Sequence, residues 1–328
     1  MPCMAEDFAK EVAAMKKVAC VGILVADIIT EPVNSYPDKG VLLPVNSITL
    51  HNGGNAMTAA INIKKLGVET EIVGKVGTDI FGRFLKERLE ESGVGVSGLC
   101  TDSETQTSTS VLMISDDGER SFFHCVGANG TFSEKDIDFS IIEDCDIVFV
   151  TGSFLLHTFD GKETAEFLKK CKKLGKTTFV DVCWDDSGRW GELLDMSMPY
   201  IDFFMPSIDE AVNIAKTESP EEIADIFIKK GVSNAVIKLG SKGCFLKTSS
   251  MEKGMHFPSK KLKAVDTTGA GDSFCSGFIA AYAHGEDIKT CALIANETGG
   301  RSVLYKGATS WTADYTELKE TVKEYNKC

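Results

Sequence analysis

Residues 264–281 read AVDTTGAGDSFCSGFIAA, and this stretch carries the strongest signal in the chain. In it a polar turn leads into Gly269-Ala270-Gly271-Asp272, where an apolar helix is predicted to begin. Small residues at a helix start let several backbone N–H groups point at one spot, where the helix dipole adds positive potential. Such a spot stabilises an anion or a phosphoryl group in transfer, and Asp272 beside it could take a proton from a hydroxyl. The alternative is that the glycines form only a tight turn and Asp272 only a helix N-terminal carboxylate.

Outward from this stretch, short apolar runs alternate with segments of helical periodicity. The apolar runs predict buried strands at residues 17–25, 70–76, 146–152, 176–182, 202–206 and 234–240. The segments between them predict helices at residues 55–67, 81–92, 162–175 and 220–231. Strands that alternate with helices favour right-handed crossovers and a mostly parallel sheet. The sequence therefore predicts an α/β fold with helices on both faces of that sheet.

Two stretches depart from this alternation. Residues 29–51 contain three prolines and then alternate polar with apolar residues, and residues 105–127 read as a strand pair around a turn. Such alternation is typical of a sheet with one solvated face. We expect both stretches to form a small β lid on one α/β domain that spans residues 1–328.

Two further segments place polar groups where an α/β sheet binds ligands. Asp27 follows the first predicted strand, and ligands of such folds bind at the carboxyl ends of the strands. Gly53, Gly54 and Asn55 open the first predicted helix, where bare backbone permits the close approach of a ligand. Both segments are therefore candidates for contact with a substrate.

Together these three segments resemble the PfkB, or ribokinase-like, family of carbohydrate kinases. The match to its signature DTTGAGDSF is specific, and similar stretches recur in family order over nearly the whole chain. The resemblance implies a ribokinase-like three-layer fold with a mostly parallel central sheet. It also implies transfer of the γ-phosphoryl group of Mg-ATP to a hydroxyl, expected to be a primary one, of a small sugar such as a pentose or ketohexose. Two alternatives stay open: a nucleoside kinase whose lid aromatics Phe122 and Phe123 stack on the base, and a non-catalytic sugar or nucleotide sensor.

The resemblance further implies roles for individual residues. For catalysis these are Asp272 as the base and, as the anion hole for the γ-phosphoryl group, Gly269, Ala270 and Gly271. For the sugar they are Asp27, Gly53, Gly54 and Asn55. For the nucleotide they are Ser207, Lys238, Gly240, Ser241, Gly243 and Asn296. For cations they are Glu210, which would hold Mg²⁺ through water, and Asp266, the backbone of Thr268 and the loop 302–307, which match a monovalent-cation (K⁺) site of some family members.

The chain departs from the family pattern at three places, one of which follows strand 176–182, where the family often has Asp-x-Asn-x-Arg and this chain has the longer stretch from Asp181 to Arg189. Ser207 stands where the family usually has Asn, and Glu210 three residues later is kept. A hydroxyl can still bond a water or a phosphate, so we expect activity with an altered metal dependence. Thr58 stands where many sugar kinases have Asn, which leaves the identity of the sugar open.

A second glycine motif, GVGVSG at residues 93–98, matches the GxGxxG pattern of dinucleotide-binding folds. That motif needs a strand before it and a helix after it, whereas here a helix is predicted before it and a loop after it. We therefore expect a helix C-cap and a turn at this place. The sequence also lacks GxxxxGK[ST], so phosphate binding is not of the P-loop type.

Composition narrows the range of partners and locations. With 35 Lys+Arg against 48 Asp+Glu the formal charge is −13, which argues against binding to nucleic acid or to an anionic membrane. No apolar run approaches the about 18 residues of a membrane-spanning helix, and the N-terminus does not read as a signal peptide. The eleven cysteines occur singly, without metal-ligand spacing, as small buried hydrophobes do in a reducing compartment. We therefore expect a cytoplasmic protein.

The lid is also expected to join two copies of the chain into a homodimer. A small sheet over a pocket exposes strand edges, which proteins pair or cover, and two-fold symmetry is the commonest form of assembly. The family resemblance points the same way. The alternative is a monomer whose lid edges are blunted by its charges and by Pro32, Pro37 and Pro44.

Overall fold

The computed structural model describes residues 16–117, 119–185 and 187–325. In these residues a large sheet of nine strands pairs in parallel from β5 to β11, and antiparallel pairings add β12 and β13 at one edge. From edge to edge the strands are β5 (Gly95–Asp102), β4 (Thr70–Gly77), β1 (Val18–Gly22), β8 (Ile147–Ser153), β9 (Thr177–Val182), β10 (Phe203–Phe204), β11 (Asn234–Lys238), β12 (Cys244–Thr248) and β13 (Met255–Phe257). The mostly parallel sheet predicted from the sequence is confirmed.

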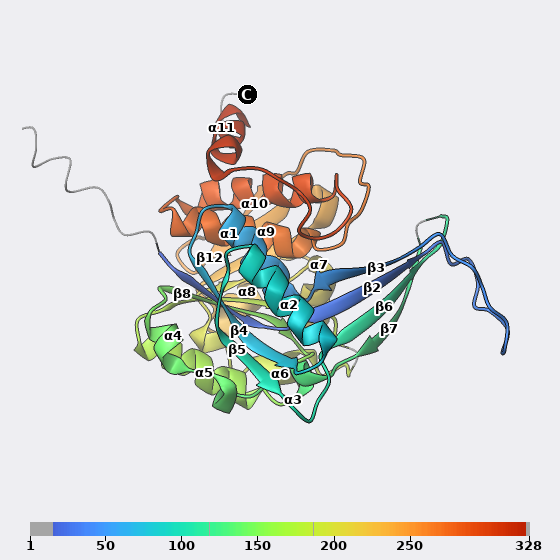
Figure 1. Ribbon diagram of the computed structural model, residues 1–328. Coiled ribbons are helices and arrows are strands. Elements are labelled where there is room, and N and C mark those ends of the chain that lie inside the picture. Colours follow the sequence, from blue (N-terminus) through green and yellow to red (C-terminus); the bar gives the residue numbers. More distant parts are fainter. Residues whose placement is uncertain (1–15, 118, 186, 326–328) are drawn as a thin grey trace, which may run out of the picture.

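Helices cover both faces of the large sheet (Figure 1). One face packs against α1 (Asn55–Lys65), α2 (Ile80–Glu91), α9 (Ala270–Ala283), α10 (Ile288–Ser302) and α11 (Tyr315–Tyr325). The other packs against α4 (Phe139–Glu143), α5 (Lys162–Lys173), α6 (Trp190–Leu194), α7 (Ile208–Ala215) and α8 (Pro220–Lys229). The short helix α3 (Ala128–Thr131) and 3₁₀ turns at 134–136, 198–200 and 240–242 complete the described part.

Side chains of the central strands alternate between the two faces. In β1, Val18 and Cys20 belong to one apolar core, and Ala19 and Val21 belong to the other. This alternation follows from the pleat of a strand that is buried on both sides. The result is the three-layer α/β arrangement expected from the sequence.

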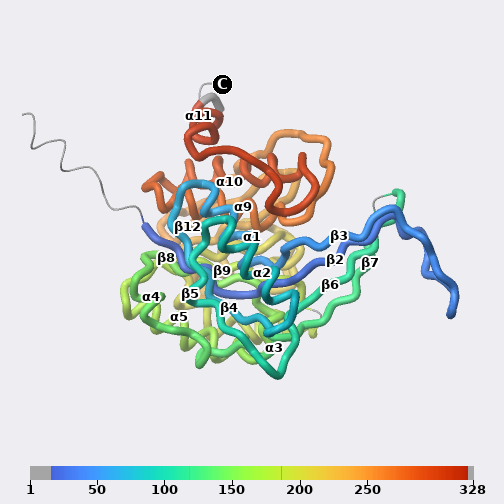
Figure 2. The backbone as a smooth tube through the Cα atoms, viewed as in Figure 1, coloured from blue at the N-terminus to red at the C-terminus, as the bar shows by residue number. Residues whose placement is uncertain are grey.

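A separate sheet, which we call the lid sheet, projects to one side of the helix-covered sheet (Figure 1). Its strands, in order, are β3 (Ser47–Gly53), β2 (Val25–Glu31), β6 (Thr109–Ile114) and β7 (Arg120–Cys125). β6 and β7 form the antiparallel pair predicted for residues 105–127, and β2 pairs in parallel with β6. The connection between β2 and β3, residues 32–46, reaches beyond the rest of the lid sheet (Figure 2).

The single strand predicted over residues 17–25 is wrong, because the run divides between the two sheets. Between β1 and β2 the side chain of Asn129 bonds the backbone of Leu24 on both sides. The Leu24 N–H donates to Asn129 Oδ1 at 3.2 Å, and Asn129 Nδ2 donates to the Leu24 carbonyl at 2.9 Å. This pair of bonds takes the place of strand pairing at Leu24, so the chain leaves the large sheet there and continues into the lid sheet.

The glycine motif at 93–98 leads into an edge strand. Ser92 is the C-cap of α2 and Gly93 has a φ of +73°, so the predicted helix end is confirmed. The loop predicted after it is wrong, because β5 begins at Gly95 and pairs in parallel with β4. The strand–turn–helix arrangement of a dinucleotide site is not present at this motif.

Nine cysteines lie within the described residues, and all nine are free. Six of them are buried, as expected of small hydrophobic residues: Cys20, Cys145, Cys171, Cys244, Cys275 and Cys291. Cys3 and Cys328 lie outside the described residues. Among the helices of the described part, none is both long and apolar enough to cross a membrane.

Candidate active site

The turn before α9 has the geometry of an anion-binding helix N-terminus. Gly269 precedes the helix with a φ of +70°. A Cβ at this position would come within 2.3 Å of the Cβ of Ala308, so both the conformation and the space require glycine. No side chain caps α9, which leaves its N-terminal dipole directed at a ligand.

Asp272 lies in the first turn of α9 and is held by the first residue of α1. Asn55 Nδ2 donates to Asp272 Oδ1 at 2.7 Å, and the Cys183 thiol donates to Asn55 Oδ1 at 3.0 Å. Burial raises the pKa of Asp272 to about 6, although the charge of Lys238 and the Asn55 bond act to lower it. The carboxylate is therefore ionised at neutral pH and more basic than an ordinary aspartate, as suits a group that accepts a proton.

A cavity of about 120 Å³, which we call the lid cavity, lies on one side of Asp272. Asp27 of β2 lines it, with its carboxylate against the backbone of Gly53, where a Cβ would lie 1.9 Å from Oδ2. Burial raises the pKa of Asp27 to about 6, although the neighbouring Ser110 hydroxyl lowers it. The residues predicted for the sugar and the base meet at this cavity together with Gly269: Asp27, Gly53, Gly54, Asn55 and Asp272.

A second cavity, of about 260 Å³, lies on the other side of the turn, and we call it the outer cavity. It brings together most of the residues predicted for the nucleotide, with two of the anion hole: Lys238, Gly240, Ser241, Gly243, Asn296, Ala270 and Gly271. The Asn296 amide donates to the Phe257 carbonyl at 2.9 Å. Gly243 has a φ of +93°, and a Cβ there would come within 2.0 Å of the same carbonyl oxygen. These contacts shape one wall of the outer cavity.

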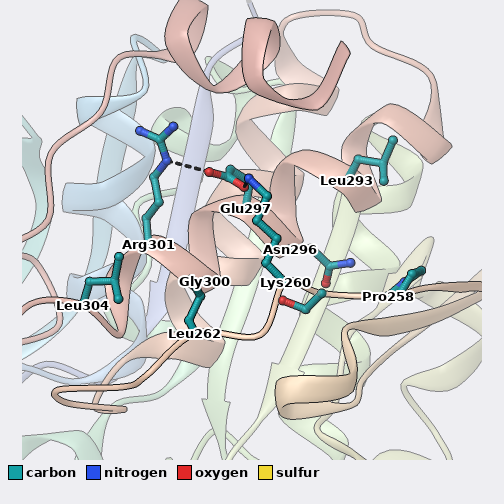
Figure 3. Close-up of a pocket in the computed structure, with 10 residues that line it drawn as sticks. Pro258, Lys260, Leu262, Leu293, Asn296, Glu297, Gly300, Arg301 and Leu304 are labelled. Carbon is teal, nitrogen blue, oxygen red and sulfur yellow. Dashed lines mark hydrogen bonds and ion pairs between the residues drawn. The ribbon is translucent and has the colours of Figure 1, made fainter. Parts of the chain in front are cut away.

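The outer cavity continues into a hollow of about 550 Å³ on the surface of α10. Figure 3 shows this hollow, with Leu262 and Lys260 from the loop after β13 facing residues of α10. The charged groups at its rim pair with one another, since Arg301 Nε lies 2.8 Å from Glu297 Oε1 and Lys260 Nζ lies 3.3 Å from Glu297 Oε2. Arg301 also pairs with Glu317, so the hollow presents an apolar floor with a rim of paired charges.

Lys238 forms a buried ion pair with Asp181. The distance from Nζ to Oδ2 is 2.5 Å, and the two side chains are 12% and 2% exposed. Burial opposes the charge on Lys238, but the Asp181 carboxylate outweighs it and holds the lysine pKa above its ordinary value. A Cβ on Gly271 would lie 3.5 Å from Nζ, so the ammonium group also stands beside the turn. Sequence reasoning gave Asp181 no role, because this pair joins residues 57 apart.

Ser207 and Glu210 are joined in a capping box at the start of α7. The Ser207 N–H donates to Glu210 Oε2 at 2.7 Å, and the Glu210 N–H donates to Ser207 Oγ at 3.4 Å. Both line a separate hollow with Trp184, although a parallel backbone bridge places Ser207 next to Lys238, one of the other predicted nucleotide residues. Burial raises the pKa of Glu210, although Lys238 attracts its charge.

Glu210 fits a magnesium site of the kind that substrates complete. Among the described residues no three His, Cys, Asp or Glu side chains are grouped to hold a metal ion. Mg²⁺ at phosphate sites keeps several waters and binds one or two carboxylates together with the substrate phosphates. A single half-buried carboxylate with a raised pKa suits that role, because a cation restores its charged form.

Asp266 and Thr268, predicted for a monovalent cation, line the lid cavity beside a residue that sequence reasoning missed. Arg120 of β7 donates to Asp266 Oδ1 and to Thr268 Oγ1. The sequence did offer one indication of a role for Arg120, because it is a basic residue on a strand that was expected to cover the pocket. Nothing in the sequence identified its partners, because Asp266 lies 146 residues away.

Comparison with known proteins agrees with this geometry. Residues 15–314 match the family model described as pfkB family carbohydrate kinase. Aminoimidazole riboside kinase of Salmonella typhimurium is 28% identical over 309 residues, which cover 90% of this chain and 91% of that protein. The fold is similar to that of Arabidopsis thaliana ribokinase complexed with ribose and ATP, with a TM-score of 0.81 and 25% identity over 94% of this chain and 99% of that one. It is also similar to the nucleoside kinase of Methanocaldococcus jannaschii, with a TM-score of 0.79 and 25% identity over the same shares.

The family model spans both cavities and the turn between them. The relatives with named activities transfer phosphoryl groups to sugars or nucleosides, and this chain covers most of their length. The protein therefore belongs to the pfkB family of carbohydrate kinases and is a phosphotransferase that acts on an alcohol group.

Proposed function

We propose that this kinase transfers the γ-phosphoryl group of Mg-ATP to a hydroxyl of a small sugar of pentose or ketohexose size. The observation that carries the proposal is the position of the turn 269–272 between two cavities. Gly269 and Asp272 line the lid cavity, and Ala270 and Gly271 line the outer cavity. In-line transfer needs the acceptor and the leaving group on opposite sides of the phosphoryl group, and this arrangement provides two such sides.

In this proposal the sugar binds first to fixed polar groups of the lid cavity. Asp27 accepts hydrogen bonds from sugar hydroxyls, and the glycines beside it let the ring approach the backbone. The lid sheet covers this cavity, since Ile29, Leu112 and Ile114 of the sheet line it. In this proposal the lid sheet and the α/β part therefore work as one domain. Their apolar side chains exclude water, which would otherwise take the phosphoryl group in wasteful hydrolysis.

Asp272 then accepts the proton of the attacking hydroxyl. Its pKa of about 6 keeps it ionised at neutral pH. The Asn55 amide fixes one carboxylate oxygen at 2.7 Å and so leaves the other oriented for the substrate. Because Cys183 donates to the same amide, the direction in which Asn55 points is set by its surroundings.

Charge that develops on the phosphoryl group meets positive potential from two sources. The uncapped N-terminus of α9 supplies backbone N–H groups and the helix dipole. The Lys238 ammonium beside Gly271 is the second source, although its charge is shared with the Asp181 carboxylate. Mg²⁺ bound to the nucleotide phosphates neutralises further charge, and Glu210 would hold it through water.

The size of the lid cavity favours a monosaccharide over a nucleoside. Pockets that enclose drug-sized ligands measure about 300–1,000 Å³, well above the about 120 Å³ of this cavity. Phe122 and Phe123, the rings suggested for stacking on a base, are each 58% exposed and do not line it. Phe123 instead packs against Tyr36, with ring centroids 6.0 Å apart.

The test measures ATP consumption with purified protein against a panel of pentoses, aldohexoses, ketohexoses and nucleosides. We expect turnover with one or more monosaccharides and much weaker turnover with nucleosides. The Asp272→Asn variant is the matched control, because it removes the base while it keeps the size of the side chain. Turnover with nucleosides alone would show that the substrate is a nucleoside and not a sugar. Binding of a sugar or nucleotide without turnover would favour a non-catalytic sensor.

We also propose that two copies join through the lid sheet, with sugar and ATP as the small-molecule partners. β3 and β7 are its edge strands, and apolar side chains on and beyond it are exposed: Tyr36, Val41, Leu42, Ile48, Phe122 and Phe123. Such an apolar surface with open strand edges is suited to pairing with a twin lid. Light scattering at micromolar concentration is expected to give twice the 35.5 kDa of one chain, and a monomeric mass with full activity would reject the dimer.

A cytoplasmic location fits the cysteine chemistry. All nine described cysteines are free, and burial raises the pKa of most of the buried thiols, Cys20 and Cys291 among them. Thiols of this kind persist in a reducing compartment. Fractionation of cells that express the protein tests the location.

A further inference from the structure

Arg120 links the lid sheet to the turn that leads into α9. Its side chain is 26% exposed and that of Asp266 is 16% exposed, so the pair is largely shielded from solvent. One terminal nitrogen of the guanidinium donates to Asp266 Oδ1, and the other donates to Thr268 Oγ1. This two-point contact fixes Arg120 in orientation as well as in position.

Oδ1 of the Asp266 carboxylate has no acceptor site left for another cation. Oδ1 accepts from the Thr268 N–H at 2.9 Å, from the Thr268 hydroxyl at 2.7 Å, and from Arg120. Oδ2 accepts from the Gly307 N–H at 3.0 Å. Each carboxylate oxygen offers about two lone-pair sites, so Oδ1, with three donors, is fully occupied, whereas Oδ2 has accepted one. A monovalent cation at Oδ1 would have to displace Arg120, so this oxygen does not fit that cation while Arg120 is bound.

We propose that the Arg120 guanidinium takes the place of a monovalent cation at this turn and positions the anion-binding residues that follow it. The inference rests on the proposed kinase function. Arg120 bonds Thr268, and Gly269 comes next in the chain. The positive charge that fixes the turn therefore belongs to a residue of β7, a strand of the lid sheet that would cover the sugar. Arg120 is a positioning residue, and K⁺ has no part in its action.

The first test compares salts at constant ionic strength. Wild-type turnover is expected to be the same in potassium chloride as in choline chloride. In Arg120→Met the freed Asp266 and Thr268 oxygens become available to K⁺. We expect the turnover of this variant in choline to fall by up to about 100-fold, the scale of loss when a catalytic group is misplaced by about 1 Å. Potassium is expected to restore it several-fold, with little change in the KM for ATP.

The matched controls separate charge from position. Arg120→Lys keeps the charge but not the two-point contact, and is expected to lose less turnover than Arg120→Met and to show no response to potassium. Arg88→Met removes an exposed arginine of α2, distant from both cavities, and is expected to change nothing. Activation of the wild type by potassium would overturn the proposal, and so would a turnover loss in Arg120→Met that potassium does not restore.

A second readout does not depend on turnover. Potassium is expected to raise the Tm of Arg120→Met relative to choline and to leave the Tm of the wild type unchanged, because a ligand that binds only the folded state stabilises it. If no sugar or nucleoside were phosphorylated, the proposed function would fail, yet this Tm comparison would still decide the role of Arg120. Should Arg120→Met not fold, a potassium response in the wild type or in Arg120→Lys would overturn the proposal, and its absence in both would support it.

Discussion

The lid cavity and the outer cavity share the wall formed by residues 269–272, but different kinds of residue line the rest of each. The lid cavity is lined by carboxylates and by Arg120 and is covered by strands of a separate sheet. The outer cavity is lined mainly by glycines, small residues and the apolar side chains of Leu262, Phe274 and Val303. Directional polar groups discriminate between patterns of hydroxyls, whereas backbone and apolar surface accept a ligand that is common to many enzymes. Under the proposed function, this difference would place selectivity on the lid side and the shared phosphoryl donor on the outer side.

The shared wall gives the largest expected effect. Asp272→Asn removes the base and is expected to lower kcat by about 10²–10⁴-fold, the usual contribution of general-base catalysis. The KM values for sugar and ATP are expected to stay within a few fold, because the side chain keeps its size and its contact with Asn55. Steady-state kinetics with both substrates checks this. Near wild-type turnover would remove Asp272 from the role of base.

The outer side is expected to respond to Lys238→Met through stability as well as catalysis. The change leaves the buried Asp181 carboxylate without its partner, which costs about 3–5 kcal/mol of the free energy of unfolding. Urea denaturation measures the loss. The double variant Asp181→Asn/Lys238→Met removes both charges and is expected to recover much of the stability. If the double variant is no more stable than the single one, the ion pair is not the cause.

The lid side is expected to respond to Asp27→Ala in sugar affinity. A hydrogen bond to a charged group contributes about 1.5–3 kcal/mol, which corresponds to a rise of about 10- to 150-fold in the KM of the sugar for one lost bond. The KM of ATP is expected to remain unchanged. Asp38→Ala, at an exposed carboxylate in the segment 32–46, serves as the control. A rise in the KM of ATP with an unchanged sugar KM would reverse the assignment of the two cavities.

The smallest effect comes from pH. Burial raises the pKa of both Asp272 and Asp27 to about 6, so both carboxylates take up protons below that pH. A protonated Asp272 cannot accept the hydroxyl proton, so kcat/KM for the sugar is expected to level off above about pH 7 and to fall about fivefold between pH 6 and pH 5, or more steeply where Asp27 must also be ionised. A pH profile with each substrate in turn measures this. A flat profile down to pH 5 would show that neither carboxylate titrates in this range.

Local patterns in the sequence predicted the layers and the turn before α9. Strand and helix periodicity depends on neighbouring residues, so it is visible without knowledge of the fold. The break at Leu24 was missed because an amide 105 residues away causes it. The strand after Gly93 was missed because glycines at 93, 95 and 98 read as a turn, whereas pairing with β4 makes the segment an edge strand.

The candidate site divides in the same way. Asp272, Asp27 and the glycines around them lie next to recognisable motifs, and the structure brings them together. Asp181 and Arg120 act through partners distant in the sequence, and their residue types are common on any surface. Ser207 is assigned to the nucleotide by its place in a motif, which stays a prediction, and its capping box with Glu210 was not foreseen from the sequence. Pair contacts of this kind depend on topology, which one sequence does not reveal.

The two hydrogen bonds from Asn129 hold the backbone at Leu24, just before β2 begins, so the rest of β2 extends away from a fixed point. At about 3.3 Å per residue, Asp27 lies about 10 Å beyond Leu24 and Glu31 lies about 23 Å beyond it. Strand register places Arg120 level with the C-terminal end of β2, since Met113 pairs with Thr30 and Arg120 pairs with Ile114. Arg120 therefore lies more than twice as far from Leu24 as Asp27 does, so a tilt of the lid sheet about Leu24 that moved Asp27 toward a sugar would move Arg120 more than twice as far.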